Sequence, residues 1–158
     1  MDEATLRWRP DGRIYLWRYH TERRDYGGLH FTADDAGLAS LARLIDLMRA
    51  ATHQAVATIR LAQPGPTEWH VPTHRVRPTA MTTWTIVHAK TRFAESHWSL
   101  TVSGSEARLE LGAGRLEPFA RGIGDVGNGR GDYSIGGDSD DDASNLDLWF
   151  WWRSEPQS

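Results

Sequence analysis

Three glycines in the last third of the chain, Gly122, Gly124 and Gly127, have the spacing G-x-G-x-x-G. In dinucleotide-binding proteins this motif joins a strand to a long helix and holds a pyrophosphate. Here more glycines and a short predicted strand over 132–135 follow, so the context is wrong. A phosphate loop needs a lysine directly after its glycines, and the sole lysine, Lys90, does not follow such a glycine motif. We therefore expect neither a nucleotide nor another cofactor.

A run of aspartates at 138–142 suggests a calcium site. Asp138, Asp140 and Asp142 have the spacing of the first three ligands of a helix-loop-helix calcium site. The pattern then fails, because Ala143 stands where a glycine should turn the chain and Trp149 where a glutamate should bind. We expect solvated loop carboxylates here and no metal.

The seven histidines are dispersed. His70 and His74 are four residues apart, but Pro72 between them prevents the helix that would align both on one metal. His88 and His97 end two predicted strands and could be cross-strand neighbours, with no acidic or third histidine ligand evident nearby. Ordinary polar strand positions are expected, again without a metal.

Ser134 lies in the sequence D-Y-S-I-G at 132–136, which differs from the nucleophile elbow G-x-S-x-G at its first residue. The chain has no cysteine, which excludes thiolate nucleophiles, disulfides and cysteine-bound zinc. A hydrolase assembled in another way stays open, but the residues favour a non-enzymatic protein.

The composition limits the class of protein further. The 158 residues, 39% of them apolar, can build a core without crosslinks. The net charge of −3 argues against binding nucleic acid through its phosphates. No apolar run approaches a membrane-spanning length, and the charged N-terminus lacks the apolar stretch of a signal peptide. We expect a cytoplasmic protein that does not enter membranes.

The elements that position these residues begin with two predicted strands, 5–9 and 13–19, joined by a turn. In the second strand Tyr15, Trp17 and Tyr19 share one face, and apolar side chains occupy the other. One face is therefore expected to meet something besides the main core.

One long helix is predicted over about 33–51. Thr32 can cap it, and apolar residues recur every three or four positions as a core-facing stripe. A single helical turn could follow at 115–121. Further strands are predicted over 29–31, 54–61, 82–89, 97–103, 107–111, 132–135 and 146–153, with 82–89 and 97–103 as antiparallel neighbours.

These elements predict an α+β fold, in which a mostly antiparallel, curled sheet of about eight strands packs on one long amphipathic helix. The length favours a single domain over 1–153, followed by a flexible polar tail over 154–158.

The last predicted strand, 146–153, places Leu148 and Phe150 on one face and Trp149 and Trp151 on the other. The strand is either central and covered on both faces, or its tryptophan face is a recognition surface, because tryptophan concentrates at interface hot spots.

We therefore predict an adaptor- or immunity-like binding protein. It would recognise a protein partner, or associate with itself, through a glycine-rich loop over 122–137 and the aromatic strand. The predicted contact residues are Asp125, Asn128, Arg130, Asp132, Trp149 and Trp151. The alternative is a small-ligand-binding protein or a hydrolase-type enzyme, in which Asp125, Asp132 and His30 meet at the same loop.

Overall fold

The computed structural model of the chain describes residues 8–20, 27–64, 77–136 and 145–151. In these residues nine strands form two mixed sheets, accompanied by two α-helices and one short 3₁₀ turn. The predicted α+β class is confirmed. The prediction of a single antiparallel sheet on one long helix was wrong.

The four-stranded sheet has the order β3-β5-β7-β6. Its strands are β3 (Gln54–Arg60), β5 (Thr83–Ala89), β6 (Trp98–Ser103) and β7 (Glu106–Leu111). β7 lies between β5 and β6, parallel to β5 and antiparallel to β6. The predicted pairing of the strands over 82–89 and 97–103 was therefore wrong. The tight turn between β6 and β7, where Gly104 has a φ of +61°, folds the hairpin back so that β7 lies against β5.

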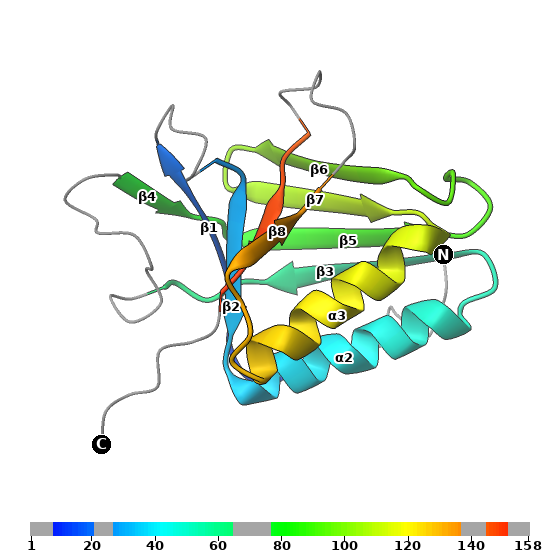
Figure 1. The fold of residues 1–158 in the computed structure, drawn as a ribbon, viewed down its shortest axis with the longest axis horizontal. Coiled ribbons are helices and arrows are strands. Elements are labelled where there is room, and N and C mark those ends of the chain that lie inside the picture. Colours follow the sequence, from blue (N-terminus) through cyan, green and yellow to red (C-terminus); the bar gives the residue numbers. More distant parts are fainter. Residues whose placement is uncertain (1–7, 21–26, 65–76, 137–144, 152–158) are drawn as a thin grey trace.

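The five-stranded sheet has the order β4-β1-β2-β9-β8. Its strands are β1 (Ile14–His20), β2 (Leu29–Ala33), β4 (Arg77–Ala80), β8 (Tyr133–Ile135) and β9 (Leu148–Phe150). β9 lies parallel to β2 and antiparallel to β8, and is therefore a central strand. Figure 1 shows the strands of this sheet running across the ends of those of the four-stranded sheet.

Two helices, α2 (Asp35–Ala50) and α3 (Leu116–Gly127), lie side by side across one face of the four-stranded sheet (Figure 1). The 3₁₀ turn η2 (Ala113–Arg115) leads into α3. The predicted helix over 33–51 is confirmed as α2, but its cap was wrong. Ala33 ends β2, and the carboxylate of Asp34 accepts the N–H of Gly37 at 2.8 Å.

Helix α3 occupies the position where we predicted the first half of a glycine loop. Gly122, Gly124 and Gly127 all lie within this helix, so the prediction of a loop from 122 was wrong. Packing explains Gly122, because a Cβ there would lie 2.4 Å from the ring of Phe150. The close approach of helix and strand requires glycine despite its poor helix propensity.

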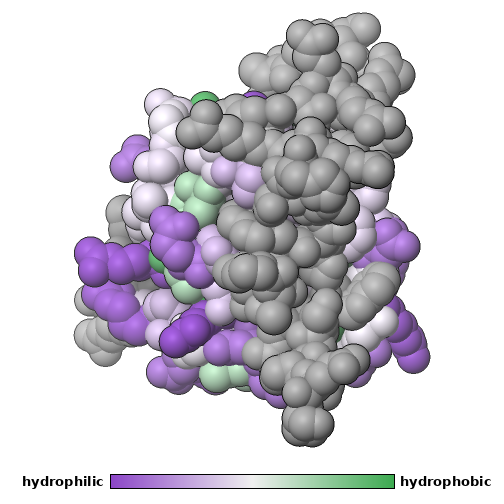
Figure 2. Space-filling view, turned by 90° about the vertical axis from the view of Figure 1, so that its left-hand side faces the viewer, coloured by the Kyte–Doolittle hydropathy of each residue, from purple (hydrophilic) through white to green (hydrophobic). Residues whose placement is uncertain are grey.

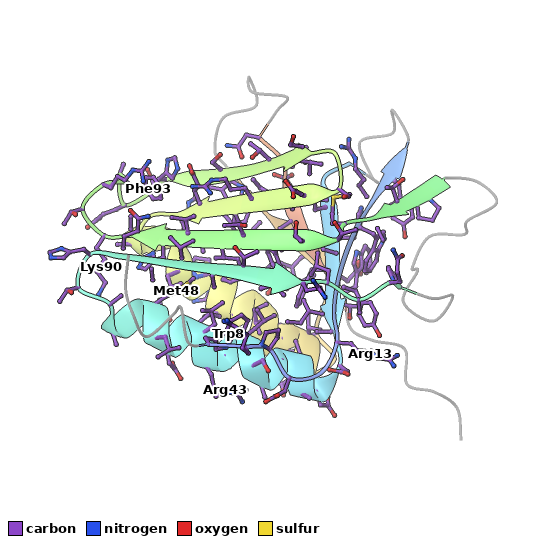
Figure 3. The ribbon with its side chains drawn as sticks, turned by 180° about the vertical axis from the view of Figure 1, so that it is seen from behind. Trp8, Arg13, Arg43, Met48, Lys90 and Phe93 are labelled. Atoms are coloured by element: carbon purple, nitrogen blue, oxygen red, sulfur yellow. The ribbon has the colours of Figure 1, made fainter. Side chains whose placement is uncertain are left out.

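Trp8 anchors the N-terminal part of the described chain beside α2 (Figure 3). Its indole N–H donates to the carbonyl of Ser40 at 2.9 Å, and its ring belongs to the main core. Neither Trp8 nor Arg9 lies in a strand, so the predicted strand over 5–9 was wrong for both, and 5–7 lie outside the described residues.

The main core fills the space between the two helices and the inner faces of both sheets. Its centre is aromatic. The ring of Trp84 on β5 lies 6.0 Å, between centroids, from Phe31 on β2 and 6.0 Å from Phe119 on α3. One cluster of apolar side chains therefore joins both sheets to the helices.

Candidate functional site

The outer face of the five-stranded sheet carries a second group of aromatic residues, which we call the aromatic face. The alternation of side chains along β1, β2 and β9 brings them together. Three of them, from β1, form an apolar cluster separate from the main core, which confirms the prediction that β1 has two apolar faces. The aromatic face consists of Tyr15, Trp17, Tyr19, His30, Trp149 and Trp151.

His30 on β2 lies at the centre of the aromatic face. Its ring is nearly parallel to those of Trp17, Trp149 and Trp151, with centroid distances of 5.8, 6.2 and 6.0 Å. Tyr19 meets it edge-on at 4.8 Å. The planar groups thus stand beside one another across three adjacent strands.

A hydrogen bond holds the ring of His30 in place. The indole N–H of Trp151 donates to Nδ1 of His30 at 2.8 Å. An indole N–H can only donate, so Nδ1 of His30 is the acceptor of this bond. In this arrangement His30 is part of the packing of the face.

Exposure differs across the aromatic face. Trp17 and His30 are fully buried, and Tyr15 and Tyr19 are 4% exposed. Trp149 and Trp151 are half-buried. The described surface on this side of the molecule is mainly hydrophilic with small apolar patches (Figure 2). Trp149 and Trp151 are therefore the more exposed residues of the aromatic face.

The predicted polar contact residues lie at the end of α3 and in the turn that follows it. Asn128, Arg130 and Asp132 are exposed. Asp132 has a φ of +95°, and its backbone N–H donates to the carbonyl of Phe150 at 2.6 Å. The register of β8 with β9 therefore places Asp132 beside Trp151.

Asp125 is held on the inner side of the same sheet. Its Oδ2 accepts the hydroxyl of Tyr133 at 2.7 Å, and the ring of Tyr133 packs on Phe150. Burial of the hydroxyl and the neighbouring carboxylate raise the pKa of Tyr133 to about 12. This pair ties the C-terminal end of α3 to β8.

The structure therefore divides the predicted contact set. It brings Asp132 next to Trp151, but places Asp125 across the sheet from both tryptophans. The alternative set of Asp125, Asp132 and His30 does not converge either, because β9 separates His30 on β2 from β8.

A groove of about 340 Å³ runs between α2 and α3. Small and aliphatic side chains line most of it, with Asp46 and Arg49 at one part of its wall. Sequence patterns do not predict this groove, because the glycines of α3 are typical of a loop. Its lining residues are Leu38, Ala39, Ala42, Ile45, Asp46, Arg49, Ala120, Ile123, Gly124 and Gly127.

The four-stranded sheet carries an acid–histidine pair that sequence reasoning missed. Glu110 on β7 lies 3.2 Å from Nε2 of His97 and 3.0 Å from Nε of Arg108. Burial alone would raise the pKa of Glu110, but the hydrogen bonds from His97 and Arg108 outweigh it and lower the pKa. His88 and His97 are not cross-strand neighbours, because β7 lies between their strands.

Within the described residues no three histidine, aspartate or glutamate side chains come together in a way that could hold a metal ion. No helix in this part of the chain is long and apolar enough to cross a membrane. A scan against protein-family models and searches of curated proteins and of solved structures found no match to this chain.

Proposed function

We propose that the chain is a non-enzymatic binding protein that recognises a protein partner through Trp149 and Trp151. The main support is the geometry of these two indoles. They are half-buried, and their ring centroids lie 5.8 Å apart with an angle of 13° between their planes. Trp149 lies in the central strand β9, and Trp151 directly follows that strand, where its backbone N–H donates to the carbonyl of Phe31 at 3.0 Å. Large, rigid aromatic side chains of this kind dominate the binding energy of protein interfaces.

Exposed carboxylates flank the indoles and define the chemistry of the partner. Asp132 lies beside Trp151, and Asp147 precedes the first residue of β9. Asn128 and Arg130 extend the polar rim toward the end of α3. An apolar centre with an acidic rim suits a partner that presents an apolar side chain surrounded by basic groups. The proposed setting is the cytoplasm, which a chain without cysteine suits.

Two of the groups near this surface that could act as acids or bases, His30 and Asp125, serve packing. Nδ1 of His30 accepts the indole N–H of Trp151, and the carboxylate of Asp125 accepts the hydroxyl of Tyr133. This use of both groups supports binding over catalysis.

Affinity capture from cell extract with the tagged protein tests the proposal. Trp149→Ser is the informative variant, because the indole of Trp151 also holds His30. Phe93→Ser is the matched control, since it removes a half-buried aromatic ring at the far end of the four-stranded sheet (Figure 3). We expect a stoichiometric partner with the wild type and Phe93→Ser, and its loss with folded Trp149→Ser.

Equal capture by all three proteins would exclude the aromatic face as the binding surface. Circular dichroism of each variant separates loss of the surface from loss of the fold. An unfolded Trp149→Ser would assign Trp149 to the core and count against the proposal.

The groove between α2 and α3 favours a second candidate function, the binding of a small apolar ligand. A Cβ at Gly124 would meet no atom within 4 Å, so the groove is open there. The charged wall residue Arg49 is ion-paired with both Asp46 and Glu117. The rest of the lining is apolar or glycine, which suits an apolar ligand better than catalysis. The fluorescent probe 1-anilinonaphthalene-8-sulfonate should bind the wild type and not Gly124→Leu; no binding to the wild type would dispose of this candidate.

A further inference from the structure

The two edge strands of the four-stranded sheet, β3 and β6, lie on opposite sides of it (Figure 1) and differ in what covers them. Residues 145–146 cover the outer edge of β6 at Trp98 and Leu100. Asn145 Oδ1 accepts the N–H of Leu100 at 2.9 Å, and the N–H of Leu146 donates to the carbonyl of Leu100 at 2.8 Å. The side-chain amide of Asn145 also donates to the carbonyl of Trp98 at 2.8 Å.

The outer edge of β3 carries a full row of backbone donors and acceptors. Leu61 N–H donates to Thr82 at 2.9 Å and Lys90 N–H donates to His53 at 3.1 Å, which fixes the odd-numbered residues as those that bond to β5. The N–H and C=O groups of Gln54, Val56, Thr58 and Arg60 therefore point away from the sheet. No backbone hydrogen bond from the described residues reaches these groups.

Nothing in the sequence of β3 protects this edge. The strand has seven residues and contains neither proline nor glycine, and its only charge is Arg60 at its end. Natural proteins discourage pairing at an edge with central charges, prolines, bulges or very short strands. A long edge with one charge at its end, whose outward backbone groups have no backbone partner among the described residues, is a template for another extended strand.

We propose that β3 pairs antiparallel with β3 of a second copy of this chain, so that the two four-stranded sheets become one continuous sheet. With the two-fold axis at Ala57, all the outward backbone groups from Gln54 to Arg60 find partners. Val56 of one protomer then opposes Thr58 of the other, a pair of β-branched residues that packs well across strands.

The sequence of β3 matches itself in this antiparallel register, which is why a second copy is the occupant. Arg60 of each protomer opposes Gln54 of the other, and the two positive charges lie at opposite ends of the paired strands. A parallel arrangement would place the two arginines side by side. At the centre, two alanines meet, so no large side chain keeps the strands apart.

Cysteine crosslinking tests both the contact and its register, because the chain contains no cysteine of its own. In the proposed register Ala57 opposes itself in a non-hydrogen-bonded pair, with a Cα separation of about 4.5 Å, which a disulfide can span. Ala55→Cys is the matched control, since it lies on the same buried face but is displaced by four residues from its counterpart.

Mild oxidation should convert Ala57→Cys, and not Ala55→Cys, to a covalent dimer on a non-reducing gel. Crosslinking of neither variant, or of both to the same extent, would overturn the proposal.

A second pair of variants tests the backbone contact directly. Thr58→Pro removes an outward N–H and keeps the hydrogen bonds between β3 and β5, whereas Thr58→Val keeps the N–H. Light scattering should give twice the chain mass for the wild type and Thr58→Val, and the single chain mass for Thr58→Pro. A wild type that stays monomeric at its highest soluble concentration would overturn the proposal. So would a monomeric wild type whose β3 pairs with a strand of another protein. If Thr58→Pro does not fold, the cysteine pair decides.

Discussion

The indole N–H of Trp151 donates to Nδ1 of His30 across 2.8 Å and joins residues 121 positions apart in the chain. Replacing Trp151 by Phe keeps an aromatic ring and removes the donor, leaving the buried Nδ1 of His30 without this bond. We expect the free energy of unfolding to fall by about 1–3 kcal/mol.

Trp149→Phe is the control for this change, because the indole of Trp149 also stacks on His30 but makes no hydrogen bond among the described residues. Urea unfolding of both variants checks the prediction. An equal loss of stability in the two would show that ring size, and not the hydrogen bond, is what matters.

Two glycines of α3 should respond to alanine in opposite directions. A Cβ at Gly122 would lie 2.4 Å from the ring of Phe150, so Gly122→Ala should lower the free energy of unfolding by about 1–3 kcal/mol. A Cβ at Gly124 would meet nothing within 4 Å, so Gly124→Ala should raise it by up to about 1 kcal/mol through helix propensity. Thermal unfolding of both variants measures the difference, and a stabilising Gly122→Ala would contradict the packing of Phe150 on the helix.

The bond between Tyr133 and Asp125 makes stability depend on alkaline pH. The pKa of Tyr133 is raised to about 12 in the folded protein, and is about 10 in an unfolded chain. A raised pKa stabilises the fold, and this stabilisation is complete at pH values below the pKa of the unfolded chain. It is lost as the pH rises through the pKa of the folded protein. Tyr133→Phe should lose about 0.5–1.5 kcal/mol at neutral pH and show a flatter decline above about pH 10.

Absorbance titration of the tyrosinate gives the matching spectroscopic test. Asp125→Asn keeps a hydrogen-bond acceptor but removes the negative charge, so the pKa of Tyr133 should move down toward its ordinary value. An unchanged titration would mean that the carboxylate contributes nothing to the shift.

His88 makes stability depend on acidic pH. Its side chain is 2% exposed, and its Nδ1 lies 3.1 Å from the carbonyl oxygen of Leu111. Burial lowers the pKa of His88, and the hydrogen bond to Leu111 offsets this only in part. The pKa of His88 is about 6.5 in the unfolded chain and lower in the folded protein. Above about pH 6.5 this difference stabilises the fold, and the stabilisation is lost as the pH falls through the folded pKa.

We therefore expect the wild type to lose stability between about pH 7 and pH 5, and His88→Gln to lose less over the same range. His53→Gln, at an exposed histidine, is the control and should follow the wild type. Urea unfolding at several pH values measures the slopes, and equal slopes for all three proteins would contradict the assignment to His88.

Sequence patterns could predict the elements whose residues alternate or repeat regularly. The two apolar faces of β1 follow from the spacing of Tyr15, Trp17 and Tyr19. The shared face of Trp149 on β9 and Trp151 directly after it follows from the same rule. The apolar stripe of α2 predicts its extent to within two residues at its N-terminal end and one at its C-terminal end.

Features set by contacts between distant segments could not be predicted. Local propensity makes Gly122 a loop residue, and only the ring of Phe150 explains why it lies in a helix. The edge strand β4 contains Pro78, which argues against a strand until its pairing with β1 is known. The parallel pairing of β5 with β7 depends on which way the β6–β7 hairpin folds, which side-chain alternation does not report.

The position of β9 between β2 and β8 affects the order in which the protein folds during synthesis. All strands of the four-stranded sheet come from residues 54–111, so this sheet can assemble while the rest of the chain is still being made. Leu29 on β2 can pair with Leu148 on β9 only after Leu148 has been synthesised. The five-stranded sheet therefore forms last. Until then β2 lacks its neighbour β9 on one side, and this open edge makes the nascent sheet prone to aggregation.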